Sequence, residues 1–242
     1  MKGHSLGNLL LAAMQDIEGG LDEGIESLSR VLRIRGSIAP STMSNVNLAA
    51  ELQDGRVIVG ESSIANSGPI QKVFLVPKKV DANEDAVAAI LAADLIVIGP
   101  GSVYTSIVPN ILVTDIANAI KTSNAVKIYV CNVANEPGET DNYSVHQHMD
   151  VIEQYMGRGV FDHLLVNSHT NLDFADQPIP HLLRMSESER RETRSAGIGL
   201  VVADVIDKEY PLHHSSDRLA KSIMEIYRAA STSTKVAAIT QG

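Results

Sequence analysis

Residues 95–106 read LIVIGPGSVYTS, four aliphatic residues followed by a loop rich in glycine and hydroxyl groups. A short apolar run that stops at a glycine is typical of a buried strand. Amphipathic patterns predict a helix before this strand, over residues 84–93, and another after it, over residues 115–121. The stretch therefore predicts a helix–strand–helix unit of an α/β protein.

The same alternation continues toward the C-terminus. Apolar runs over residues 126–131 and 163–166 predict two further strands, and the pattern of residues 146–156 predicts a helix between them. A later strand is expected over residues 200–206 and a closing helix over residues 216–230. Strands that alternate with helices favour right-handed crossovers, so we expect a mainly parallel sheet.

The N-terminal part has a different pattern, in which the Asp54-Gly55 pair stands between two apolar runs. This arrangement is a strong signal for a β-hairpin with a tight turn. The elements expected here are helices over residues 6–14 and 21–32, hairpin strands over residues 47–52 and 56–61, and a strand over residues 70–76.

Residues 167–197 are less regular than the rest of the chain. They contain prolines at 178 and 180 and a charged run from Glu187 to Arg194. We interpret this region as a solvated helix and loop that runs over the surface. The alternative is a lid that closes over a ligand.

Composition and charge narrow the class of protein. With 44% hydrophobic residues and no domain break in the pattern, the 242 residues are expected to form a single domain over residues 1–242. The formal net charge of −9, with no run of Lys and Arg longer than Lys78-Lys79 or Arg190-Arg191, argues against nucleic acid as the partner. No stretch approaches the roughly 20 apolar residues of a membrane span, and no signal peptide is found, so we expect a cytoplasmic protein. Cys131 ends an apolar run, which favours a buried structural thiol over a nucleophile.

The loop after residues 95–98 is the first candidate binding site. Ligands of doubly wound sheets lie beyond the carboxyl ends of the strands. Glycines let backbone N–H groups approach an oxyanion, and hydroxyl groups can donate to phosphate oxygens. A tight connection without a ligand is the alternative. The candidate residues of this loop are Gly99, Gly101, Ser102, Tyr104, Thr105 and Ser106.

A second polar loop, residues 132–143, follows the next expected strand. Asn132 could bond a base, a ribose or a sugar hydroxyl. Glu139 or Asp141 could hold Mg²⁺ or a hydroxyl group. The alternative is that Thr140 or Asp141 caps the helix that begins near Ser144, and the two interpretations can coexist.

The start of the chain offers a weaker candidate. His4, Ser5 and Asn8 lie where the first helix opens, and helix N-termini attract anions. The pairs His146/His148 and His213/His214 lack the i, i+4 spacing of two zinc ligands on one helix face, so no metal site is predicted. No catalytic residue can be assigned from the pattern.

Four segments resemble the bacterial gluconeogenesis factor family, which is related to the 2-phospho-L-lactate transferases of deazaflavin coenzyme synthesis. The segments are GHSLGNLLLAA (residues 3–13), NVNLAAELQDGRVIVGESSI (45–64), ADLIVIGPGSVYTSIVPNILV (93–113) and YVCNVANEPGETDNYSVHQHM (129–149). The resemblance extends from residue 3 to about residue 230. It implies a Rossmann-like three-layer fold and a ligand role for Gly138 and Thr140 besides the residues already named.

The resemblance implies two alternative functions. The gluconeogenesis factor branch binds UDP-sugars, notably UDP-N-acetylglucosamine, and supports cell shape and growth on gluconeogenic carbon sources without turnover. The transferase branch uses Mg²⁺ and passes a phospholactyl-type group from a guanosine diphosphate donor to a deazaflavin alcohol. The residues 99–106 and 138–141 are more similar to the first branch, so a nucleotide-sugar-binding regulator is expected.

Two departures from the family pattern bear on this expectation. Family members usually begin with a strand and a GGGTG-type loop, and this chain is expected to be N-terminally truncated relative to them. Where the family tends to carry Arg-His-Asp, this chain has His213-His214-Ser215. A third hypothesis is therefore a chain that no longer binds nucleotides. An exposed sheet edge would favour association, and we expect a homo-oligomer.

Overall fold

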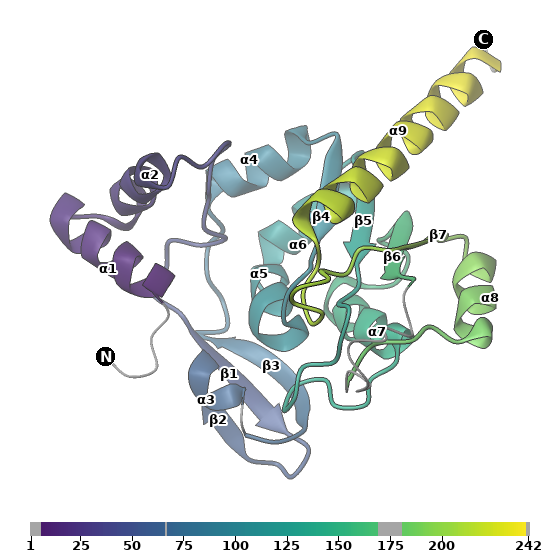
Figure 1. The fold of residues 1–242 in the computed structure, drawn as a ribbon. Coiled ribbons are helices and arrows are strands. Elements are labelled where there is room, and N and C mark those ends of the chain that lie inside the picture. The colour runs from purple at the N-terminus through teal and green to yellow at the C-terminus, as the bar shows by residue number, and fades with distance from the viewer. Residues whose placement is uncertain (1–5, 66, 169–180, 241–242) are drawn as a thin grey trace.

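Four parallel strands form the central sheet, in the order β4-β5-β6-β7 (Figure 1). They are β4 (Leu95–Ile98), β5 (Val126–Val130), β6 (His163–Asn167) and β7 (Gly199–Ala203). The predicted mainly parallel sheet is thus confirmed. The computed structural model describes residues 6–65, 67–168 and 181–240.

Both faces of this sheet are covered, because successive side chains of β5 pack into hydrophobic clusters on opposite faces. Tyr129 belongs to the main hydrophobic core, whereas its neighbours Ile128 and Val130 pack into a second cluster with Leu219 and Ile226. Leu219 and Ile226 lie on α9 (Ser216–Thr240), which therefore covers one face. The other face is covered by helices that follow the strands, so the fold has the three layers that the resemblance implied. These are η1 (Val103–Ile107), α5 (Val108–Ile111), α6 (Thr114–Thr122) and α7 (Val145–Met156), together with α4 (Glu84–Ala92), which precedes β4.

A small antiparallel sheet, β2-β1-β3, packs on the main core. The predicted hairpin is present as β1 (Asn47–Leu52) and β2 (Val57–Val59), and β3 (Ile70–Val76) pairs with the free side of β1. The Tyr155 hydroxyl on α7 accepts a hydrogen bond of 2.8 Å from the Val73 amide, which joins this sheet to the parallel layer.

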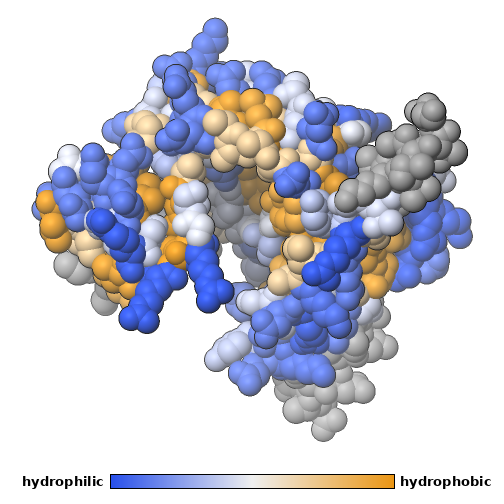
Figure 2. Space-filling view, turned by 90° about the horizontal axis from the view of Figure 1, so that it is seen from above, coloured by the Kyte–Doolittle hydropathy of each residue, from blue (hydrophilic) through white to orange (hydrophobic). Residues whose placement is uncertain are grey.

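The N-terminal helices α1 (Leu6–Glu18) and α2 (Leu21–Val31) form a helical hairpin at the left of Figure 1. Within the described residues, neither helix contributes a side chain to the buried hydrophobic core. Large apolar side chains remain exposed there, with Leu6 and Ile17 each 73% exposed. Figure 2 shows the molecule hollowed between this hairpin and the rest of the chain.

Several predicted boundaries were wrong. The predicted strand over residues 56–61 ends at Val59, because Gly60 turns at φ +100° into α3 (Glu61–Ile64). The expected loop before residue 115 contains η1 and α5. The strand expected over residues 200–206 is β7, which ends at Ala203, and α9 continues past residue 230.

The predicted surface excursion is confirmed for the part that the structure describes. Helix α8 (Glu187–Ser195) begins at the Ser186 cap and buries only Thr193. The lid alternative for residues 167–197 includes residues 169–180, which lie outside the described residues.

No single helix among the described residues is long and apolar enough to cross a bilayer. The bent pair Val103–Ile111 and Thr114–Thr122, whose parts meet at 80°, reaches that length and apolar composition only when the two are taken together.

Candidate functional site

The two predicted binding loops are joined to each other beyond the carboxyl ends of β4 and β5. Asn132 accepts a hydrogen bond of 3.2 Å from the Gly101 amide through Oδ1 and donates one of 3.0 Å to the Gly101 carbonyl through Nδ2. The Asn132 side chain therefore pairs with both the N–H and the C=O group of Gly101, as the backbone of a neighbouring strand would, and fixes the first loop in place. The sequence placed both loops at this edge of the sheet, and the structure brings them into contact.

Hydroxyl groups of the first loop donate to carboxylates of the second. The Thr105 hydroxyl donates to Glu139 at 2.7 Å, and the Ser102 hydroxyl donates to Glu136. The sequence suggested these two hydroxyl groups as donors to a phosphate, but in the structure both already donate to carboxylates of the protein. A phosphate bound by Ser102 and Thr105 would have to replace both carboxylates.

Gly99 occupies a position that requires glycine. Its φ is +79°, and a Cβ atom there would lie 2.8 Å from the Val130 carbonyl oxygen. The chain can leave β4 and cross the end of β5 closely only without a side chain at this point. Gly99 and Pro100, joined by a cis peptide bond, line an apolar cavity, and Pro100 and Gly101 line a polar one.

The remaining predicted residues of the second loop shape its turn. The buried Thr140 hydroxyl accepts a hydrogen bond of 2.9 Å from the Glu136 amide, and exposed Asp141 accepts one of 2.8 Å from the Gly138 amide. The helix that follows is capped by Ser144, whose side chain accepts from Gln147 in a capping box. The alternative that Thr140 or Asp141 caps α7 is thus wrong, because the N-cap position directly before Val145 is occupied by Ser144.

Glu139 is the most perturbed carboxyl group of the loop. It is 6% exposed, and its Oε2 atom has no hydrogen-bond partner. Burial raises its pKa, the Thr105 hydrogen bond opposes this, and the charge of Glu136 adds to it. Beside it, the Tyr104 and Tyr143 hydroxyls lie 3.1 Å apart, and burial raises the pKa of Tyr104.

A polar cavity of about 500 Å³ opens next to these loops and extends to the segment between β7 and α9. Its walls contain one carboxylate, two asparagines and two histidines, and no lysine or arginine is among its described lining residues. The residues that line it are Pro100, Gly101, Asn132, Val133, Ala134, Asn135, Glu136, Pro137, Leu212, His213, His214, Ser216 and Leu219.

His214 links the segment between β7 and α9 to the end of β5 by a hydrogen bond. Its Nε2 atom lies 3.3 Å from the Cys131 carbonyl oxygen, a geometry in which the ring donates. Burial lowers the pKa of His214, so the ring is neutral and its Nδ1 atom is left as an acceptor. Burial also raises the pKa of Cys131 to about 12, which agrees with a structural thiol.

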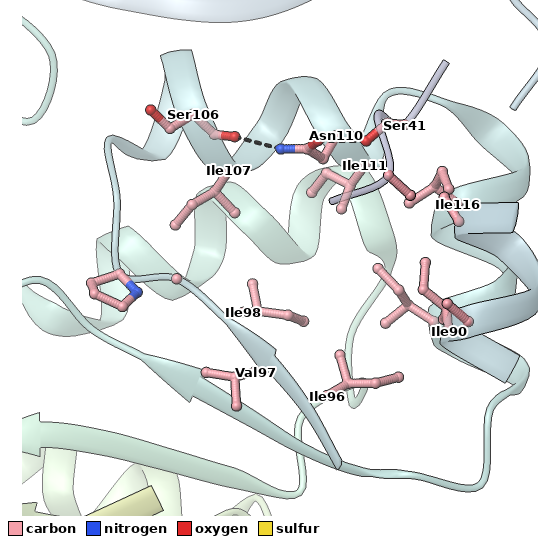
Figure 3. Close-up of a pocket in the computed structure, with 16 residues that line it drawn as sticks. Ser41, Ile90, Ile96, Val97, Ile98, Ser106, Ile107, Asn110, Ile111 and Ile116 are labelled. Atoms are coloured by element: carbon pink, nitrogen blue, oxygen red, sulfur yellow. Dashed lines mark hydrogen bonds between the residues drawn. The ribbon is translucent and has the colours of Figure 1, made fainter. Parts of the chain in front are cut away.

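The apolar cavity, of about 470 Å³, lies on the other side of the Gly99-Pro100 turn. Figure 3 shows aliphatic side chains from β4, α4, α5 and α6 directed toward it. Its polar groups bond to one another, since Ser41 donates to Asn110 and Asn110 donates to the Ser106 carbonyl at 2.7 Å. Ser106 is therefore placed on this cavity and not on the polar one.

Other predicted residues lie away from the polar cavity or outside the description. His4 and Ser5 lie outside the described residues, as does the side chain of Asn8. His146 bonds Thr193 at 2.8 Å, and His148 is fully buried. Among the described residues no group of three or more histidine, cysteine or acidic side chains is arranged to hold a metal ion.

Five polar cavity residues, Asn135, Glu136, His213, His214 and Ser216, were not singled out as ligand contacts from the sequence. Asn135 and Glu136 stand in the second loop, where a polar run after a strand was the signal. The histidine pair His213/His214 was considered as metal ligands and as a departure from the family's Arg-His-Asp, and not as ligand contacts. Its place beside the strand ends depends on the path of the chain after β7.

Comparisons with known proteins extend this description. The family model described as 2-phospho-L-lactate transferase CofD matches residues 1–206. A gluconeogenesis factor from Halalkalibacterium halodurans is 37% identical over 237 residues, which cover 93% of this chain and 71% of that protein. The gluconeogenesis factor of Bacillus subtilis is 37% identical over 231 residues, with 94% and 73% covered. The chain belongs to the gluconeogenesis factor family.

A solved structure supports this assignment. The crystal structure of a UPF0052 family protein from Bacillus halodurans is 36% identical and superimposes with a TM-score of 0.78, over 92% of this chain and 72% of that one. Coverage differs among members of the gluconeogenesis factor family. A relative from Nostoc sp. is 43% identical over 95% of this chain, but the chain spans only 52% of that relative's length.

Proposed function

We propose that this chain binds a nucleotide-sugar of the UDP-N-acetylglucosamine type and acts as a regulator of carbon metabolism and cell shape. The observation that carries the proposal is the polar cavity at the carboxyl ends of β4 and β5, walled in part by Pro100, Gly101 and residues 132–137. Sheets of this class bind ligands at this edge. The names of the relatives support the regulatory role.

Some of the proposed binding residues line the cavity, and others hold its loops. Gly101 and Asn132 line the cavity, whereas Gly99, Ser102, Thr105, Glu139 and Thr140 hold its two loops in place. His4, Ser5 and Asn8 belong to the proposal through the resemblance alone. The proposal also includes a cytoplasmic location and self-association of the chain.

A transferase that uses a nucleotide-activated donor is the second candidate. It is favoured by the family model, which describes a transferase, and by the Glu136 carboxylate in the cavity wall. Mg²⁺ is commonly held by one or two carboxylates together with substrate phosphates. Glu136 is the carboxylate placed to contribute, because Glu139 is buried and its pKa is raised. The ion would supply charge stabilisation, and its remaining ligands would come from phosphate and water.

A thermal-unfolding panel tests the proposal. The chain is unfolded with UDP-N-acetylglucosamine, UDP-glucose, GDP and NAD, each with and without Mg²⁺. At ~100 times Kd, binding stabilises the folded state by about 2.7 kcal/mol. For a chain of this size this corresponds to roughly 5–11 °C in Tm.

Outcomes of the panel separate the hypotheses. A shift confined to UDP-sugars, without consumption of the ligand, supports the regulator. Mg²⁺-dependent turnover with a deazaflavin acceptor would establish the transferase instead. No shift with any nucleotide contradicts both and leaves a chain that does not bind nucleotides.

A matched pair of variants places the ligand. Asn132→Asp removes the donor that bonds the Gly101 carbonyl, so we expect the UDP-sugar shift to fall by at least half. Asn118→Asp makes the same chemical change at an exposed position of α6 and should leave the shift unchanged. Equal shifts in the two variants would place the ligand elsewhere.

A further inference from the structure

The polar cavity has hydrogen-bond acceptors among its polar side chains, beside apolar residues such as Val133 and Leu212. Asn135 is one example, since its Nδ2 atom donates to the Tyr143 carbonyl at 3.1 Å and its buried Oδ1 atom has no partner. A buried acceptor without a donor costs free energy. This Oδ1 atom is enclosed, so the acceptors that can bond a ligand group carrying O–H or N–H are those of the other polar side chains in the wall.

Glu136 is one of these acceptors. One of its carboxylate oxygens receives the Ser102 hydroxyl, and the other lies 3.5 Å from the Asn132 Nδ2 atom, at the limit of a hydrogen bond. That Nδ2 atom already donates to the Gly101 carbonyl at 3.0 Å. A carboxylate can only accept, so Glu136 retains capacity for a ligand donor.

His214 adds a third acceptor. With Nε2 directed to the Cys131 carbonyl and the ring held neutral by burial, Nδ1 is the unprotonated nitrogen. The Asn132 and Asn135 amides already donate to the Gly101 and Tyr143 carbonyls. Of the other described polar side chains in the wall, the His213 ring and the Ser216 hydroxyl can donate as well as accept.

Donors suited to a phosphate are correspondingly few. The backbone amides of Gly101, Asn135 and Glu136 already donate to Asn132, the His181 carbonyl and Thr140. No lysine or arginine is among the described lining residues. Phosphate groups bind to clustered N–H donors and cations, and the Glu136 charge repels them.

We propose that this cavity binds the hydroxyl-bearing part of the ligand, a sugar ring, and that the phosphates lie outside it. The inference rests on the proposed function and adds to it the orientation of the ligand. Neutral hydroxyl groups can donate to Glu136 and His214 without requiring a counter-charge. The cavity volume of about 500 Å³ is within the usual range for small-molecule sites.

Binding measurements with UDP and UDP-N-acetylglucosamine test the orientation. In the wild-type chain the sugar should tighten binding relative to UDP. Glu136→Gln replaces an acceptor-only group by an amide of the same shape, and we expect it to reduce the sugar's contribution to affinity roughly tenfold. Binding of UDP alone should change by no more than about twofold. Glu187→Gln, which removes an exposed charge on α8, is the control and should change neither Kd.

The opposite result is equally clear. If Glu136→Gln changes the Kd of UDP and of UDP-N-acetylglucosamine by the same factor, the cavity does not distinguish the sugar, and the inference is wrong. The proposed function would survive that result, because both nucleotides would still bind.

A second measurement does not depend on a nucleotide or on a variant that folds. Free N-acetylglucosamine is titrated into ¹⁵N-labelled wild-type chain at millimolar concentration. Amide shifts confined to residues 132–136 and 213–216 support the inference even if no nucleotide binds, in which case only the proposed function fails. Shifts elsewhere, or none, overturn the inference.

Discussion

At the scale of single residues, Gly99 makes the sharpest prediction. A Cβ atom at this position would lie 2.8 Å from the Val130 carbonyl oxygen and 3.3 Å from Ile107 Cδ1. Gly99→Ala should therefore lower the free energy of unfolding by about 1–3 kcal/mol beyond the cost of placing alanine at positive φ. Chemical denaturation measures the loss.

Gly159→Ala is the matched control for this prediction. Gly159 has φ +75°, close to the φ of +79° at Gly99, and a Cβ atom there would meet nothing within 4 Å. Gly159→Ala should therefore lose the roughly 1–2 kcal/mol that a positive φ costs alanine, without a clash between the new Cβ atom and the backbone. If both variants lose the same stability, the close approach of Gly99 to β5 is not what requires glycine.

Glu139 predicts a dependence on pH. Because its pKa is raised in the folded state, that state binds more protons than the unfolded one above the ordinary pKa of 4.5. Its contribution to the free energy of unfolding therefore falls as pH rises from 4.5 through the raised pKa. Glu139→Gln does not titrate, so wild type should lose stability relative to this variant as pH rises through that window.

Denaturant melts at several pH values check the sign of this effect. Glu187→Gln on α8 is the comparison, because it removes an exposed carboxylate from another part of the chain. Identical pH profiles for the two variants would contradict the assignment of the effect to Glu139.

The same residues show where sequence reasoning reached its limit. The Gly99–Ser106 turn and Asn132 could be assigned to one edge of the sheet, because parallel strands end together. That Ser102 and Thr105 donate to Glu136 and Glu139 could not be predicted, because these pairs are 34 residues apart and depend on how two loops meet. A hydroxyl in a loop looks the same in sequence whether its partner is a ligand or a carboxylate.

At the scale of elements, the two capped helices α7 and α8 should respond differently to loss of the cap. Ser144→Ala removes the cap of α7, which buries seven residues, and should lower the global free energy of unfolding by about 1 kcal/mol. Ser186→Ala removes the same kind of cap from α8, which buries only Thr193. We expect it to weaken hydrogen-exchange protection within α8 with little global effect.

Hydrogen-exchange rates and denaturant melts of Ser144→Ala and Ser186→Ala test whether the loss of stability is global or confined to the capped helix. Equal global losses would show that α8 unfolds together with the core and not by itself.

Most elements could be predicted because their patterns are local. Strands β3 and β4 lie where their apolar runs predicted them, and Asp54-Gly55 marked the hairpin correctly. Helices η1 and α5 were missed, since Pro109 and the preceding glycines gave the segment the composition of a loop. The pairing of β3 with β1 was missed as well, because strand pairing depends on non-local contacts.

At the scale of the whole molecule, the expected homo-oligomer becomes a testable prediction about α1. Leu6, Leu10, Ala13 and Ile17 are spaced as one face of a helix, and all four are exposed. Every copy of the chain carries this face, so two copies can bury it against each other across a twofold axis. Light scattering should therefore show self-association that weakens in Ile17→Glu, with Gln15→Glu on the same helix as the control. A wild-type chain that stays monomeric at high micromolar concentration would contradict self-association, and equal association of both variants would move the interface away from α1.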